Sequence, residues 1–180
     1  GNVYLYMSLV GGLILLAAIF IIQYAAGHTR FEPMIQALVE KGISPWLVMA
    51  LVIGGFGVKA GIIPLHIWLP RAHPVAPAPA SALLSALMIK TGAYGFFRFL
   101  YLLLTAPEGS SLLGYQQTFG YLFIWIGAVT MFVGALLGIL NNSMKKILAY
   151  SSISQMGYIL FGLGTGAFLG PDGATALAGA

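Results

Sequence analysis

The chain has 180 residues, of which 59% are hydrophobic and only 7% are charged, and its formal net charge is +4. Soluble domains carry about 25% charged residues, so this composition excludes a water-soluble globular protein and indicates a membrane protein. The absence of cysteine excludes disulfides and thiolate metal sites in this sequence, and the scattered cations form no nucleic-acid-binding cluster.

The first apolar run covers residues 3–26 and contains no charge. A spanning helix needs about 20 mostly apolar residues, so this run predicts the first membrane span. In the polar stretch that follows, apolar residues recur at positions 31, 34, 35 and 38. This spacing predicts a short amphipathic helix over about 31–41 at the membrane interface, with Gly42 as its C-terminal cap.

The second span is predicted over 46–69, entered through Ser44 and Pro45. Its second half is rich in glycine and contains Pro64, which has no backbone N–H to donate. We therefore predict that the helix breaks between Gly61 and Pro64. Residues 70–79 include four prolines and are predicted to form a stiff extended turn.

The remaining spans are predicted over 80–104, 118–140 and 144–163, with a loop at 105–117 and a short turn at 141–143. The fold class is therefore all-α: a polytopic transmembrane bundle of about five spanning helices, one of them broken, forming a single membrane domain over 1–180. Because the chain does not begin with Met and trails off in small residues, we expect it to be an internal piece of a longer protein.

The charged residues of the connections predict which end of the bundle faces the cytoplasm. When the spans alternate in direction, Arg71, Lys145 and Lys146 fall at one end, with no acid beside them. The other end has two basic residues, Arg30 and Lys41, and three acidic residues, Glu32, Glu40 and Glu108. Cytoplasmic loops carry an excess of Lys and Arg, so we expect this end to face the cytoplasm.

Two lysines lie near the middle of predicted spans. Placing Lys59 or Lys90 there costs about 2.5–3.5 kcal/mol on insertion scales, so intramembrane lysines commonly have a function. Their spans are antiparallel neighbours, and at matched depth we expect the two side chains to face each other. Burial favours the neutral amine, so the pair could release and regain a proton. The alternative is that both lysines only bind freed carbonyls and hold helices together.

Further side chains extend this predicted relay. His66 follows Lys59 by seven residues and would share its helix face, unless it is a solvated histidine at a helix end. Tyr94 lies four residues after Lys90 and could hydrogen-bond it. Ser85 and His73 could line a wet path, although a small serine also permits close helix packing and His73 could be solvated in the turn.

All four acidic residues lie outside the predicted spans, at Glu32, Glu40, Glu108 and Asp172. An unpaired buried cation is costly, so we expect a membrane carboxylate from an upstream helix to pair with Lys59. Without a carboxylate nearby, the histidines make a poor metal site, and we expect no metal and no cofactor in this chain.

Three blocks of the sequence, at residues 57–73, 88–95 and 146–157, resemble the antiporter-like membrane subunits of respiratory complex I. The same family includes Mrp-type cation/proton antiporters and membrane-bound hydrogenases, and the resemblance covers about 1–175. Complex I members usually have an acid where this chain has Arg71, so residues 69–77 look more like the hydrogenase-4 and formate hydrogenlyase branch.

The resemblance implies a subunit of about fourteen helices built from two inverted repeats, of which this chain would be the sixth to tenth. Lys59 matches the lysine beside the break of the seventh helix, and Lys90 matches the lysine of the eighth. The implied function is proton translocation in a redox-driven complex of the cell (cytoplasmic) inner membrane. Iron–sulfur, flavin, quinone or Ni–Fe centres would belong to partner subunits. The alternative is a Mrp-type sodium/proton antiporter without a redox partner.

Overall fold

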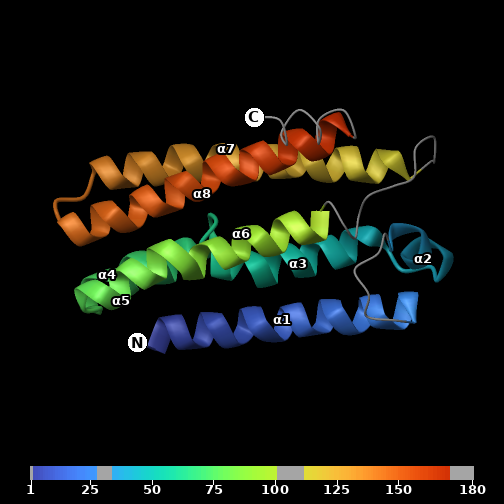
Figure 1. The fold of residues 1–180 in the computed structure, drawn as a ribbon, viewed down its shortest axis with the longest axis horizontal. Helices are drawn as coiled ribbons and strands as arrows, with labels where there is room; N and C mark the ends of the chain where they lie inside the picture. Colours follow the sequence, from blue (N-terminus) through green and yellow to red (C-terminus); the bar gives the residue numbers. More distant parts are fainter. Residues whose placement is uncertain (1, 28–33, 101–111, 171–180) are drawn as a thin grey trace.

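The computed structural model describes residues 2–27, 34–100 and 112–170, which form helices and no strand. In Figure 1 the long helices lie side by side along one axis. Five segments within the described residues are long and apolar enough to cross a membrane, which confirms the predicted all-α polytopic class: Asn2–Ala26, Pro45–Val75, Pro79–Arg98, Leu113–Ile139 and Met144–Leu169.

The first span is α1, Asn2–Ala26, and the short helix that follows it is α2, Ile35–Glu40. Residues 28–33 lie outside the described part, so the start of the predicted interfacial helix is not covered. α2 packs on α1 and α3 through Ile35 and Leu38, which are both buried. Gly42 has a φ of 69°, and the Ile43 N–H donates to the Leu38 carbonyl, so the predicted glycine cap is present.

The second span is interrupted at the residues where a break was predicted. Helix α3, Pro45–Ala60, ends at Gly61, whose φ of 68° is left-handed. The chain then forms a 3₁₀ turn, η1, Leu65–Trp68, and the short helix α4, Leu69–Val75. Glycine adopts this φ without strain, and Pro64 has no N–H for the ladder, so sequence chemistry accounts for the interruption.

The extended turn predicted over 70–79 is wrong for most of its length. α4 covers its first half, and α5, Ala78–Leu83, begins close behind; the extended dihedrals are at Ala76 and Pro77. Pro70 and Pro79 each lie in the first turn of a helix, where a missing N–H costs nothing. Lys145 Nζ donates to the carbonyls of Pro74 (3.4 Å) and Ala76 (3.2 Å) and so holds this corner.

The third span changes its helical form twice. After α5 comes a π-helical stretch, η2, Leu84–Met88, and then the α-helix α6, Ile89–Arg98. Single π turns inside helices are uncommon and occur often at functional sites. The stretch ends two residues before Lys90. The predicted end of this span, 101–104, lies outside the described residues.

The last two spans are α7, Leu113–Ile139, and α8, Met144–Leu169. α7 begins five residues before its predicted start at 118, so the end of the predicted loop 105–117 is helical; residues 105–111 are not described. The polar residues of its first turn are typical of a loop, but Gln116 is buried there and glutamine is a good helix former. α8 extends six residues past the predicted 163.

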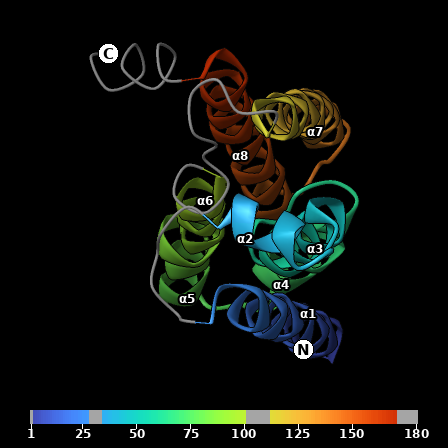
Figure 2. The ribbon, with the colours of Figure 1, turned by 90° about the vertical axis from the view of Figure 1, so that its right-hand side faces the viewer.

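Glycines set how closely the helices approach one another. A Cβ at Gly127 would lie 2.5 Å from the Phe161 nitrogen, and one at Gly157 would lie 2.4 Å from the Met131 nitrogen, so α7 and α8 are in backbone contact. α3 and α6 meet in the same way, with Gly92 against Ala60. Small residues permit such contact in membranes. Figure 2 shows α1 and the α7–α8 pair on opposite sides of α3 and α6.

The α4–α5 and α7–α8 connections lie at the same end of the bundle, as Figure 1 shows. This end carries Arg71 on α4 and Lys145 and Lys146 on α8. These three basic residues therefore lie at one end, as the alternation of spans requires, and which side of the membrane they face stays a prediction.

Candidate functional site

The break in the second span is held together by contacts across it. The indole Nε1 of Trp68, in η1, donates to the Val58 carbonyl in α3 at 2.7 Å. The Ile63 N–H donates to Thr130 Oγ1 of α7 at 3.3 Å. Irregular backbone at membrane depth is tolerated only where protein or a wet cavity satisfies it. Here a tryptophan and a threonine from other elements do so, which the sequence did not indicate.

Lys59 lies in the last turn of α3, directly before the break, and is half-buried. Its Nζ donates to Ser8 Oγ of α1 at 3.5 Å and lies 5.9 Å from the centre of the Tyr4 ring. Both contacts are with neutral groups of α1. Sequence reasoning missed Tyr4 and Ser8, although their i, i+4 spacing on a mostly apolar span is a signal that could have found them.

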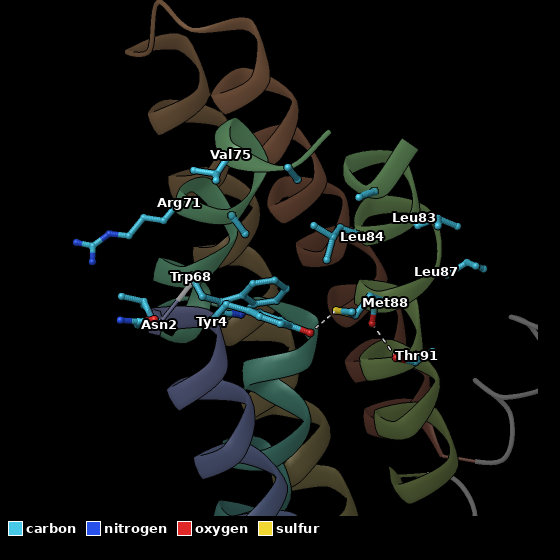
Figure 3. Close-up of a pocket in the computed structure, with 14 residues that line it drawn as sticks. Asn2, Tyr4, Trp68, Arg71, Val75, Leu83, Leu84, Leu87, Met88 and Thr91 are labelled. Atoms are coloured by element: carbon cyan, nitrogen blue, oxygen red, sulfur yellow. Dashed lines mark hydrogen bonds between the residues drawn. The ribbon is translucent and has the colours of Figure 1, made fainter. Parts of the chain in front are cut away.

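Tyr4 also connects α1 to two other elements. Its ring packs 5.1 Å from the Trp68 ring, and its hydroxyl donates to Met88 Sδ at 3.4 Å. Figure 3 shows Tyr4, Trp68 and Met88 side by side, with Leu84 above them. They lie in a mainly apolar groove of about 1030 Å³ between α1, α4 and the α5–η2 segment, with the exposed Arg71 at its edge.

His73 is 1% exposed and lies inside the bundle, not in solvent at a turn. Its Nδ1 forms a short hydrogen bond with Ser81 Oγ, and Ser85 Oγ lies 3.4 Å from its Nε2. Ser152 Oγ of α8 donates to Ser85 Oγ at 3.2 Å. The structure therefore brings His73 and Ser85, both predicted from the sequence, together. Ser152 extends this row of polar side chains to α8, so the row connects the second, third and fifth spans.

Lys90 lines a cavity of about 270 Å³ between α6 and α8. Ser85 and Ser152 line the same cavity, together with Ser151 and Gln155. The polar row that starts at His73 therefore reaches the cavity that Lys90 borders. Within the described part of the chain the side chain of Lys90 is exposed. Its burial in the complete protein stays a prediction.

The prediction that Lys59 and Lys90 face each other is wrong. Gly92 is the α6 residue in contact with α3, and Lys90 precedes it by two positions, or about 200° around the helix. Lys90 therefore points away from α3, toward α8, whereas Lys59 contacts α1. Matched depth along two helices does not fix the direction of a side chain around the helix axis, and this is why the prediction failed.

His66 and Tyr94 do not take the predicted positions either. The His66 ring lies 6.4 Å from the Tyr150 ring of α8, away from the α1 contacts of Lys59, because the break changes the helical phase between them. Its Nδ1 is buried and has no hydrogen-bond partner among the described residues. Tyr94 is 61% exposed and lies beside Arg98 of its own helix, with 5.9 Å between guanidinium carbon and ring centre.

These features define a polytopic helical membrane protein with titratable side chains at a broken helix and beside a polar cavity. The chain belongs to the family described as NADH:quinone oxidoreductase/Mrp antiporter, TM, whose model matches residues 1–178. This confirms the family resemblance. It does not test the roles of the individual residues.

Several curated proteins are similar to the chain over most of its length. Hydrogenase-4 component B of Escherichia coli K12 is 33% identical over 164 residues, which cover 91% of this chain and 23% of that protein. NADH-quinone oxidoreductase subunit M of Pseudomonas aeruginosa is 35% identical, with 86% and 30% covered. NAD(P)H-quinone oxidoreductase chain 4 3 of a Picosynechococcus strain is 36% identical, with 94% and 30% covered. The chain therefore spans about a quarter to a third of these relatives.

Proposed function

We propose that this chain conducts protons through the membrane as part of an antiporter-like subunit of a redox-driven complex. The observation that carries the proposal is the polar row His73–Ser85–Ser152, which leads to the cavity beside Lys90 inside an otherwise apolar bundle. Polar groups within a membrane are expensive, so a connected row of them favours a path for an ion or a proton.

The chemistry of the row suits protons. Histidine exchanges a proton near physiological pH, and a hydroxyl both donates and accepts hydrogen bonds. The cavity of about 270 Å³ beside Lys90 has room for several waters, since one water occupies about 30 Å³. Waters there can bridge polar groups too far apart for direct contact. The path would run from His73 through Ser85 and Ser152 to the Lys90 amine.

Lys59 is the second proton-carrying group in this proposal. Because its side chain contacts α1 while Lys90 points toward α8, transfer between them requires waters or a change of side-chain position. A carboxylate from another segment of the complete protein would serve as counter-charge, as the unpaired cation suggests. His66, with its unpartnered Nδ1 near Tyr150, is a candidate for a branch toward α8.

The similar proteins support the proposed setting. One is a hydrogenase-4 component, and others are subunits of quinone oxidoreductases. By analogy, the complete protein would assemble with other membrane and redox subunits in the cytoplasmic membrane, with the redox groups held by those partners. The identities, 33% to 36%, do not separate the branches, so the hydrogenase-4 likeness stays a prediction.

The second candidate is a sodium/proton antiporter of the Mrp type, which the family description also names. It would use the same path without electron transfer. The identity of the subunits that co-purify with the complete protein distinguishes the two candidate functions. Iron–sulfur or quinone-reducing subunits favour the first, and small antiporter subunits favour the second.

The direct test is proton translocation by vesicles that contain the complete complex, normalised to assembled protein. Lys59→Met and Lys90→Met should each abolish most of the translocation, because methionine fills the same space without a titratable group. Thr165→Val is a suitable control, since among the described residues this half-buried hydroxyl bonds a carbonyl of its own helix, at Phe161. Translocation at the parental rate by both lysine variants would refute the proposal.

A further inference from the structure

The Ile63 N–H, between α3 and η1, is one of the donors that the helix break leaves without a helical partner. It donates to Thr130 Oγ1, in the middle of α7, at 3.3 Å. Thr130 is fully buried, with 0% of its surface exposed. Other described threonines behave differently: Thr118 and Thr165 bond carbonyls of their own helices, at Gly114 and Phe161. Thr130 contacts a different span, at the point where that span is interrupted.

The support beneath Thr130 is rigid. Gly127 and Gly134 flank it on α7, and a Cβ at either would lie within 3 Å of an α8 backbone nitrogen, at Phe161 or Ser154. Helices in backbone contact cannot slide or rotate without a clash. The hydroxyl of Thr130 is therefore held at a fixed place, and with it the backbone of Ile63.

The position of Ile63 matters because Lys59 lies four residues before it, in the last turn of α3. Between Lys59 and Ile63 the chain turns at Gly61. After the break, the indole of Trp68 donates a hydrogen bond back to the Val58 carbonyl of α3. The last turn of α3 is thus held by Trp68 and the connecting backbone by Thr130. Ile63 is half-buried, and its N–H points at the fully buried Thr130. Without the Thr130 hydroxyl this N–H would lose its acceptor, and the backbone would shift to find another.

We infer that Thr130 is a positioning residue for Lys59: its hydroxyl fixes the helix break and so sets where the Lys59 amine lies. This inference rests on the proposed function. Removal of the hydroxyl should reduce proton translocation about fivefold, the factor that one neutral hydrogen bond typically represents. The dependence of translocation on pH should also shift, because a displaced amine has different neighbours.

The test compares Thr130→Val, which keeps the shape and removes the acceptor, with Thr130→Ser, which keeps the acceptor. Both are assayed in the complete complex, in vesicles, over a range of pH and per amount of assembled protein. Thr130→Val should translocate less with a shifted pH profile, whereas Thr130→Ser and the control Thr165→Val should match the parent. If Thr130→Val fails to assemble, Thr130→Cys replaces it, since a thiol is a weak acceptor of similar size to the serine hydroxyl.

A Thr130→Val or Thr130→Cys complex with the parental rate and pH profile would overturn the inference, even if less of it assembled. Lys59→Met is measured in parallel to separate this inference from the proposed function. If Lys59→Met is inactive and Thr130→Val is normal, the positioning role alone is wrong. If Lys59→Met is normal, the proposed function of Lys59 fails, and the inference fails with it.

Discussion

At the scale of single residues, the surroundings of Lys59 are neutral on the side that the structure describes. Ser8 Oγ accepts one hydrogen bond from the amine, and the Tyr4 ring lies close by. A packing role and a proton-carrying role make opposite demands on such a lysine. Packing needs only a donor of the right length, whereas proton transfer needs a group that can become neutral.

Arginine distinguishes these roles because it keeps the charge and the donors but does not deprotonate in proteins. We predict that Lys59→Arg reduces proton translocation nearly as much as Lys59→Met. The measurement is translocation in vesicles per assembled complex. A Lys59→Arg complex that pumps close to the parental rate would show that the amine does not titrate during transport.

Ser85 is the link between His73 and Ser152, so its hydroxyl is the point at which the polar row can be cut. Ser85→Ala should lower translocation while leaving the assembled amount unchanged, because alanine is tolerated in a helix and removes only the hydroxyl. Ser44→Ala is the matched control, since Ser44 is exposed and its side chain makes no capping hydrogen bond. Equal translocation by the two variants would remove Ser85 from the path.

At the scale of elements, the close contact of α7 with α8 organises the site. α7 presents Thr130 to the break, and α8 presents Ser152 and Gln155 to the region around Lys90. The two parts of the site are therefore attached to one pair of helices. Any change in the spacing of this pair would displace both parts together.

We predict that Gly127→Leu severely destabilises the protein, because the added side chain would meet the α8 backbone at Phe161. Overpacking of this kind costs typically about 1–3 kcal/mol, and backbone on the far side cannot move aside. Gly162→Leu on α8 is the control, since a Cβ there meets nothing within 4 Å. Thermal unfolding of the detergent-solubilised complex measures the difference, and equal midpoints would contradict the predicted contact.

At the scale of the whole molecule, the basic residues at one end of the bundle predict its orientation. These 180 residues contain no cysteine, so once any cysteine elsewhere in the complete protein is replaced, a single cysteine can be introduced at either end. Ser143→Cys, in the α7–α8 turn, should react with an impermeant thiol reagent from the cytoplasmic side. Ser44→Cys, at the start of α3, should react from the opposite side, and the reverse pattern would invert the orientation.

Sequence alone predicted the spans and the break because these depend on residue content: long apolar runs, and a glycine followed by Pro64. It did not predict the helical form of α4, since prolines in a first turn look like turn residues in a sequence. The start of α7 was missed because polar residues there were interpreted as loop. The direction of Lys90 could not be predicted, because depth along a helix does not fix the direction of a side chain around its axis. The direction of His66 could not be predicted, because the break alters the helical phase before it.

The fluorescence of Trp68 can report on the state of the helix break. Its indole is 1% exposed and bonded to the Val58 carbonyl, whereas Trp46 and Trp125 are 43% and 57% exposed. With those two and any tryptophan elsewhere in the complete protein replaced by phenylalanine, the remaining fluorescence would come from the indole that bridges α3 and η1. Indole emission moves to longer wavelength when its surroundings become polar. A red shift during turnover would therefore record, in real time, the entry of water into the break beside Lys59.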